Sequence, residues 1–275
     1  MKKILIPVDF SKHSEYACVL AAKIAKKSNS EVHIIHMVEL PSGIIDMGAG
    51  SNFSIPESML YLRKVREKLF DIKNNYFPDF DDIQHAIRFQ NPFEGIRDYS
   101  KKIGADLIVM GSKGQTALEE IFIGSNTEKT VISMDIPVLI TKKDNDNFKF
   151  KKLVFASTFE KDEADAFEGF LSFVENFKSK IYLLKINTPQ NFENTSDSKK
   201  KIEDFIKDYN LDNYSINIYN DKSVEEGILN FSKEKDIDLI SLATHGRTGL
   251  SRFFNGSISL NLSKNVLKPV LTFKV

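Results

Sequence analysis

An internal repeat runs through this chain and restricts its possible folds more than any other feature. Two early segments return 149 positions later, and three later segments return after 132 positions instead. A constant offset that changes once indicates two copies of one fold, the second copy being shorter by the difference of 17 residues. The matching segments are Lys3–Phe10 with Lys152–Phe159, Ser30–Ile35 with Ser179–Leu184, 94–96 with 226–228, 105–108 with 237–240, and 137–139 with 269–271.

The change of offset falls between Thr188 and Tyr214 of the second copy. The first copy has a stretch rich in Gly, Ser and Met at the corresponding place, from Pro41 to Pro56, and we expect the part from 43 to 52 to be a mobile loop over the first site. The polar run 143–147 separates the two copies. These boundaries predict one domain at 1–145 and another at 150–275.

Each copy alternates short runs of Ile, Val and Leu with helix-like stretches. Runs without polar alternation are typical of central strands that are covered on both faces. Strand–helix alternation predicts an α/β fold, with a doubly wound, five-stranded parallel sheet flanked by helices in each copy. The predicted strands are 3–9, 31–38, 83–89, 105–110 and 137–142, then 152–158, 180–187, 214–219, 237–243 and 269–274. In the first copy, helices are expected from Ser11 to about Lys27, from Pro56 to about Asn75, after Asn91-Pro92 and after Gly124-Ser125.

Composition excludes several classes of protein. Lysine plus arginine equals aspartate plus glutamate at 38 each, so neither nucleic acid nor an anionic membrane is expected as the main partner. No run approaches the roughly 20 apolar residues of a membrane span, and the first apolar run is too short for a signal peptide. We therefore expect a cytoplasmic protein. Cys18 is the only cysteine, which excludes an intrachain disulfide and favours a buried small side chain.

Glycines gather after the fourth predicted strand. The sequence Met110-Gly111-Ser112-Lys113-Gly114 is followed by nine residues and then by Gly124-Ser125-Asn126-Thr127. In doubly wound sheets, ligands bind beyond the carboxyl ends of the strands, where strand order reverses. Glycines let backbone N–H groups approach phosphate oxygens, and the second group opens a helix whose first amides attract anions. Hydroxyls and the Lys113 ammonium add further donors.

This pattern of glycines resembles the nucleotide signature of the universal stress protein family. The opening Pro7-Val8-Asp9-Phe10-Ser11 and the closing Pro137-Val138-Leu139 are also similar to the first and last strands of that family. The resemblance covers both copies. It implies an adenine nucleotide alpha hydrolase-like fold that binds ATP or AMP, with or without Mg²⁺. The site residues that it implies are Pro7, Val8, Asp9, Val38, Met110, Gly111, Lys113, Gly114, Gly124, Ser125, Asn126 and Thr127.

Roles within that site follow from the same resemblance. Asp9 would meet the ribose, since a carboxylate accepts both ribose hydroxyls. Val38 and Met110 would border the adenine, and the remaining glycines, with the residues after Gly124, would hold the phosphates. For Asp9 the alternative is a helix N-cap or a solvated turn residue. For the glycines the alternative is a turn without a ligand.

The second copy departs from the signature. Thr158 stands at the position of Asp9, Glu160 at that of Ser11, and Ala243 replaces the first motif glycine, although Gly246 and Gly256-Ser257 keep their spacing. A methyl group at Ala243 would hinder a close backbone approach. We therefore expect a degenerate site there that takes a phosphate or a smaller anion at most, through Gly246, Arg247 and Ser257.

Three functions remain open at this point. The first is a nucleotide-binding stress-response protein whose ligand changes conformation or partner choice. The alternatives are a slow ATPase and a nucleotide-independent interaction scaffold. There is no Gly-x4-Gly-Lys-Ser/Thr loop, no catalytic residue is assigned, and His33 and His36 are expected on opposite faces of a strand, which disfavours a shared metal. The last strands of the two copies are expected to pair as an intramolecular pseudo-dimer, with a homodimer of chains left open.

Overall fold

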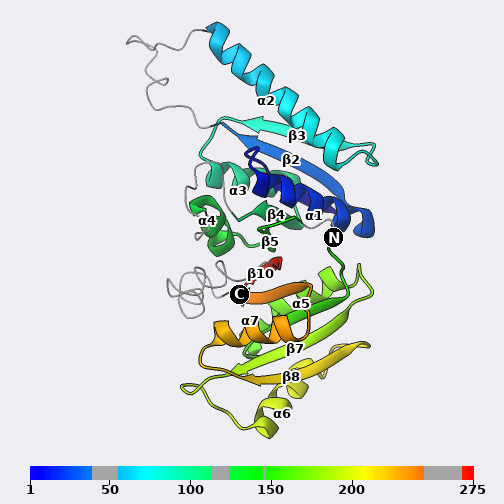
Figure 1. Ribbon diagram of the computed structural model, residues 1–275, viewed down its shortest axis with the longest axis vertical. Coiled ribbons are helices and arrows are strands. Elements are labelled where there is room, and N and C mark those ends of the chain that lie inside the picture. The colour runs from blue at the N-terminus through cyan, green and yellow to red at the C-terminus, as the bar shows by residue number, and fades with distance from the viewer. Residues whose placement is uncertain (39–54, 113–123, 145–146, 245–267) are drawn as a thin grey trace.

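The computed structural model describes residues 1–38, 55–112, 124–144, 147–244 and 268–275 (Figure 1). The repeat is visible as the same succession of strands and helices in two halves. The first half contains β1 (Lys3–Pro7), α1 (Lys12–Ser28), β2 (Glu31–Met37), α2 (Ile55–Tyr76), β3 (Ile83–Arg88), α3 (Pro92–Ile103), β4 (Leu107–Gly111), α4 (Ser125–Ser133) and β5 (Val138–Thr141). The second contains β6 (Lys152–Ala156), the short 3₁₀ helix η2 (Lys161–Glu163), α5 (Ala164–Val174), β7 (Lys180–Asn187), α6 (Thr195–Ile206), β8 (Tyr214–Asn220), α7 (Val224–Glu234), β9 (Leu239–Thr244) and β10 (Val270–Lys274).

Local signals set the ends of the helices where the sequence predicts them. The Ser11 hydroxyl accepts a hydrogen bond from the backbone N–H of Ser14 and so caps α1. Asn91 caps α3, with Pro92 at its first position, and Gly104 ends that helix at φ 64°. The N-cap of α4 is Gly124, as expected, but it contributes no side chain to the cap. The first amides of α4 are therefore left to other acceptors.

All ten strands form one sheet in the order β3-β2-β1-β4-β5-β10-β9-β6-β7-β8. Every pair within a half is parallel, whereas β5 and β10 are antiparallel and place Leu139 opposite Leu271. The predicted pairing of the two last strands within one chain is confirmed. Each half is doubly wound, because the chain moves outward from β1 to β3 and then crosses to β4 on the other side of β1.

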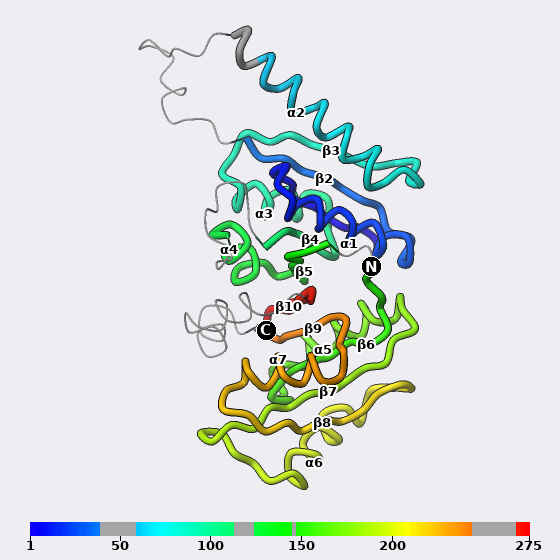
Figure 2. Tube along the Cα trace, viewed as in Figure 1, coloured from blue at the N-terminus to red at the C-terminus, as the bar shows by residue number. Residues whose placement is uncertain are grey.

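Helices cover both faces of the sheet, and one apolar core extends through both halves. Side chains of α1, α2, α5 and α6 pack together with strand residues, including the junction residues Leu139 and Leu271, on one face. On the other face, α3 and α4 cover the first half and α7 covers the second (Figure 2). The two halves are therefore continuous in the core as well as in the sheet. Among the helices that the structure describes, none combines the length and the apolar composition needed to cross a bilayer.

Candidate functional site

The carboxyl ends of β1 and β4 are neighbours at the point where strand order reverses. Ile4 lies opposite Leu107 and Leu5 opposite Ile108 in this pair. If the same offset is continued beyond the strand ends, Asp9 comes level with Ser112. Pro7 ends β1 and Val8 follows it, and Met110 and Gly111 end β4 on the same edge. The sheet thus brings together the strand-end residues that the sequence predicts for one site.

Asp9 lies in a tight turn between β1 and α1. Its Oδ1 accepts hydrogen bonds from the Ser11 hydroxyl at 2.6 Å and from the Ser11 backbone N–H at 3.1 Å. Phe10 has φ 63°, a left-handed conformation that reverses the direction of the chain. β1 therefore ends at Pro7, two residues before the end at residue 9 that the sequence predicts. Asp9 therefore has the turn role that the sequence left open. Its role toward a ribose stays a prediction.

A histidine that the sequence did not connect with this turn supports it from β2. His36 Nδ1 lies 2.8 Å from the carbonyl oxygen of Val8, and the His36 ring lies 4.4 Å from the ring of Phe10, centroid to centroid. Burial lowers the pKa of His36 below its usual value, and this effect exceeds the opposing influence of the hydrogen bond to Val8. The neutral ring thus packs against the turn. His33, which contacts Tyr99, lies on the opposite face, as expected.

Gly111 is a point of close approach between β4 and α1. A Cβ atom at this position would lie 2.6 Å from the carbonyl carbon of His13 and 2.7 Å from its carbonyl oxygen. Real Cβ atoms do not come this near to backbone atoms, so only glycine fits without a shift of the helix. Thr127 donates its hydroxyl to the Gly111 carbonyl at 3.0 Å and is itself buried. This bond ties the first turn of α4 to the end of β4, and a role of Thr127 toward a ligand stays a prediction.

The first turn of α4 presents unpaired donors. Within the part of the chain that the structure describes, the backbone N–H groups of Ser125, Asn126 and Thr127 have no acceptor. Gly124 N–H donates to the Ser112 carbonyl at 2.8 Å, which ties the start of α4 to the end of β4. The Ser112 hydroxyl is buried and has no hydrogen-bond partner among the residues that the structure describes. A buried polar group of this kind costs about 1–3 kcal/mol when it stays unpaired, so a ligand that pairs it gains affinity.

Val38 and Met110 are the predicted neighbours of a purine, and both are apolar and buried at strand ends. Val38 follows β2, and its N–H donates to the Arg88 carbonyl at 2.8 Å, which keeps it at the carboxyl edge. Lys113 and Gly114 lie outside the described residues, as do the segment 43–52 and the motif residues His245, Gly246, Arg247, Gly256 and Ser257 of the second half.

The second half arranges its corresponding turn around a different carboxylate. Glu163 is fully buried, and its Oε2 accepts hydrogen bonds from the hydroxyls of Ser157 at 2.5 Å and Thr158 at 3.0 Å. Its Oε1 has no hydrogen-bond partner in the part of the chain that the structure describes. Glu160, at the position of Ser11, is paired with Lys201 of α6. Sequence comparison missed Glu163 because the aligned residue of the first half is Ser14, a different type.

A partly buried ion pair lies next along this edge, between Lys185 of β7 and Glu193. The Lys185 ammonium is 2.8 Å from Glu193 Oε2, and it also donates to Asn187 at 3.2 Å and to Ser198 at 3.1 Å. Lys185 is buried, whereas the Glu193 side chain is 36% exposed. The hydrogen bond from Lys185 lowers the pKa of Glu193 below its ordinary value of 4.5. Lys185 stands at the position of His36, so the two halves differ here in charge.

Replacing Glu193 by glutamine is expected to lower the free energy of unfolding at pH 7 by about 1–3 kcal/mol, less than for a fully buried pair because Glu193 is partly solvated. The folded-state pKa of Glu193 is depressed, so its contribution is present above pH 4.5 and is lost as the pH falls through the folded-state value. Urea unfolding at pH 7 and at successively lower pH measures this. The difference in the free energy of unfolding between Glu193→Gln and the wild type should become smaller at acidic pH. Glu203→Gln, which breaks an exposed pair with Lys199, is the control and should change stability little. A difference that is independent of pH would contradict this account.

Comparison with known proteins agrees with the repeat and the sheet. The model of the "Universal stress protein family" matches residues 1–142 and 149–274. Universal stress protein MJ0531 of Methanocaldococcus jannaschii is 33% identical over 142 residues, which are 52% of this chain and 82% of that protein. Universal stress protein MJ0577 of the same organism is 30% identical over 157 residues, covering 52% of this chain and 96% of that protein.

Solved structures match the whole chain. The crystal structure of a universal stress protein from Archaeoglobus fulgidus covers 99% of this chain and 96% of its own, with a TM-score of 0.71 and 19% identity. A putative universal stress protein from Pseudomonas aeruginosa covers 100% and 93%, with a TM-score of 0.64 and 14% identity. At these identities the likeness concerns the fold. Together with the family match in both halves, it shows that this chain belongs to the universal stress protein family and carries two of its domains in tandem.

Proposed function

We propose that the first half binds an adenine nucleotide, ATP or AMP, and that the ligand changes the conformation or the partner choice of a stress-response protein. The phosphates would lie at the start of α4 and beside Gly111, the ribose on Asp9, and the adenine between Val38 and Met110. Mg²⁺ would accompany the phosphates of ATP. In this proposal Lys113 and Gly114 complete the phosphate contacts.

One observation carries the proposal: the three amides of α4 that have no acceptor in the described part of the chain lie on the same sheet edge as the Asp9 carboxylate. Helix amides without acceptors, together with the partial positive charge of a helix N-terminus, favour a phosphate. A carboxylate favours a group with two hydroxyl donors. A nucleotide offers both groups in one molecule, and the apolar side chains at the ends of β2 and β4 suit the face of a purine.

The second half is proposed not to take an adenine nucleotide in the same way. Thr158, at the position of Asp9, already donates its hydroxyl to the buried Glu163 carboxyl group. Glu163 also places a carboxylate where the first half has the small hydroxyl of Ser14. Negative charge at this place would repel phosphates. One nucleotide per chain is therefore the expected stoichiometry.

Isothermal titration of the purified full chain with ATP and with AMP tests the proposal. Replacing Asp9 by asparagine keeps an oxygen acceptor for the turn but removes the charge, so affinity should fall about 10- to 100-fold through loss of a charge-assisted hydrogen bond. Asp79→Asn is the matched control, because Asp79 is exposed, pairs only with Lys26 among the described contacts, and lies away from this edge.

Three possible results would each contradict a different part of the proposal. Absence of binding at millimolar nucleotide in the wild-type chain would end the nucleotide proposal. Unchanged nucleotide affinity in Asp9→Asn would contradict the proposed contact between Asp9 and the ribose. Release of phosphate with turnover from the wild-type chain would favour the slow ATPase over a ligand-controlled protein.

A further inference from the structure

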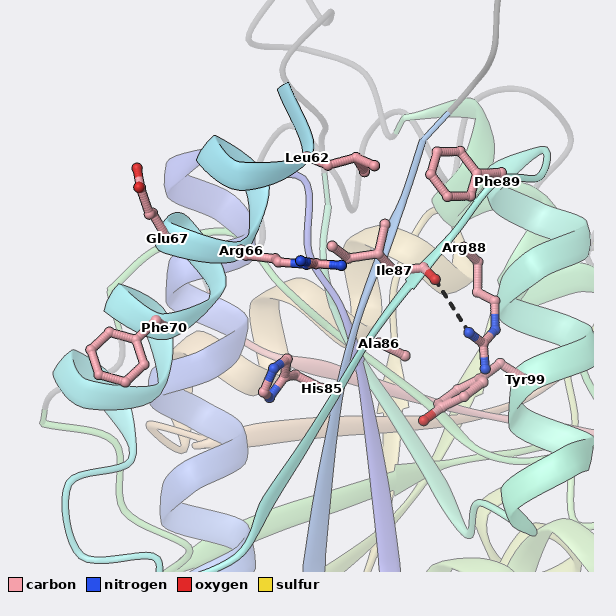
Figure 3. A pocket seen from close by; sticks show the side chains of 10 residues that line it. All are labelled: Leu62, Arg66, Glu67, Phe70, His85, Ala86, Ile87, Arg88, Phe89 and Tyr99. Carbon is pink, nitrogen blue, oxygen red and sulfur yellow. Dashed lines mark hydrogen bonds between the residues drawn. The ribbon is translucent and has the colours of Figure 1, made fainter. Parts of the chain in front are cut away.

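A groove of about 750 Å³ lies along β3, at the outer edge of the first half (Figure 3). Side chains of α2 form one wall, and Tyr99 of α3 with Arg88 forms the other. It is separate from the candidate nucleotide site, which lies at β1 and β4. The residues that line the groove are Leu62, Arg66, Glu67, Phe70, His85, Ala86, Ile87, Arg88, Phe89 and Tyr99.

The floor of the groove is the outer edge of β3. Among the strands that the structure describes, β3 is the first in the sheet order and pairs with β2 alone. The Arg88 carbonyl accepts from Val38 after β2, so the backbone groups of Arg88 point toward β2. Because successive residues of a strand alternate in direction, the N–H and C=O groups of His85 and Ile87 point outward. The Arg88 guanidinium agrees with this, since it folds over the edge and donates to the Ile87 carbonyl at 3.2 Å.

Apolar side chains flank this open edge. Leu62, Arg66 and Phe70 recur every four residues and form a stripe on the side of α2 next to the groove. Phe70 is 62% exposed and Phe89 is 52% exposed. Exposed aromatic side chains beside an unpaired strand edge are features that soluble proteins normally avoid unless another chain binds there.

The groove carries positive charge that has no counterpart in the described residues. Neither Arg66 nor Arg88 forms an ion pair with a carboxylate in that part of the chain, and Arg88 lies 5.2 Å from the centre of the Tyr99 ring. The Glu67 carboxylate accepts from Arg63 at 3.1 Å on the exposed side of α2. Two guanidinium groups thus face the groove, and each can bind a carboxylate in a bidentate manner.

We propose that this groove binds an extended segment of a partner protein in which acidic and apolar residues alternate. The segment adds a strand to β3 through the outward N–H and C=O groups of His85 and Ile87. It turns its apolar side chains toward α2, against Phe70 and Phe89, and its carboxylates toward α3, where one of them draws the Arg88 guanidinium away from the Ile87 carbonyl. A second copy of this chain fits less well, because its β3 brings another Arg88 into the groove and like charges across paired strands repel.

A synthetic peptide tests strand addition directly. The probe is a fluorescent eight-residue peptide of alternating valine and glutamate, and the comparison peptide has lysine in place of glutamate. Fluorescence anisotropy with the full chain should give at least about tenfold tighter binding for the glutamate peptide, with a dependence on salt. On binding, amide hydrogen exchange should slow in residues 83–89, since outward N–H groups become paired.

Two variants of one residue separate backbone pairing from side-chain contact. His85→Pro removes an outward N–H without removing a bond to β2, and it should weaken the glutamate peptide about tenfold or more. His85→Ala keeps the N–H and should bind nearly as the wild type does. Arg88→Glu tests charge on the α3 side of the groove, and it should reverse the preference between the two peptides, whereas Arg66→Glu on the α2 side should change it less. Urea unfolding of each variant reports whether the first half stays folded.

Several results would overturn the proposal. Equal affinity of the wild-type chain for the two peptides would contradict an acidic partner. Equal affinity of His85→Pro and His85→Ala for the glutamate peptide would contradict strand addition. Light scattering of the wild-type chain without peptide gives a third test. A dimer that His85→Pro converts to a monomer would assign the edge to a second copy of the chain instead.

Discussion

Replacing Gly111 by alanine is expected to lower the free energy of unfolding by about 1–3 kcal/mol and to abolish nucleotide binding in a titration that detects it for the wild type. The added Cβ would lie within 2.7 Å of three atoms of His13, two of them in the backbone. The start of α1 cannot move away freely, because Ser11 caps it and also binds Asp9. A shift of α1 therefore displaces Asp9 from the amides of α4, which couples the loss of stability to the loss of binding.

Gly95→Ala is the matched control for this substitution. Its Cβ would also come within 3 Å of two other atoms, but both are at the end of the flexible Met37 side chain. Gly95 lies inside α3, where alanine is favoured over glycine by about 1 kcal/mol, so the two effects offset each other. Urea unfolding and nucleotide titration of both variants decide the matter. Gly111→Ala with wild-type affinity would show that the close approach of β4 and α1 is unrelated to the ligand.

Much of the architecture follows from local signals in the sequence. Helix caps such as Ser11 and Asn91 act through hydrogen bonds to residues two or three positions away. Their effect can therefore be predicted from the sequence without knowledge of the fold. Apolar runs without alternation predicted buried strands, and the offsets of the repeat predicted which strands correspond. The pairing of β5 with β10 could also be predicted, because two short apolar last strands would otherwise be exposed edges.

Other features depend on contacts between distant residues and could not be predicted. Glu163 and Lys185 have no counterpart of the same type in the first half, so the repeat gave no signal for either. The role of Glu163 can be recognised only from the structure, in which the hydroxyls of Ser157 and Thr158 donate to its carboxyl group. The bond from the Thr127 hydroxyl to the Gly111 carbonyl joins residues 16 positions apart, and the motif gave no signal for it.

The groove on β3 was missed for a related reason. Edge strands and central strands have similar residues here, and only the sheet order shows that β3 lacks a second neighbour. In the sequence, the residues of α2 that line the groove have the pattern of an ordinary amphipathic helix. Only the position of α2 beside the edge of the sheet shows which of them are exposed.

The junction of the two halves is expected to tolerate loss of its ion pair but not a charge in its centre. Lys274 and Asp135 approach within 2.7 Å across the junction, but the Asp135 side chain is 73% exposed, so Lys274→Ala should cost less than about 1 kcal/mol. Leu271 is fully buried opposite Leu139 between β5 and β9. Leu271→Asp removes apolar burial and places a carboxylate without partners in the core, which should cost more than about 4 kcal/mol.

Such a loss at Leu271 should also change how the chain unfolds. In the wild type the sheet and one core cluster cross the junction, so the two halves stabilise each other and a single unfolding transition is expected. In Leu271→Asp the halves lose this mutual support, and calorimetry should resolve two transitions. Leu271→Ala, which should cost about 2–5 kcal/mol without adding charge, shows how much of the effect is lost packing. Two transitions already present in the wild type would mean that β5 and β10 pair without coupling the stability of the halves.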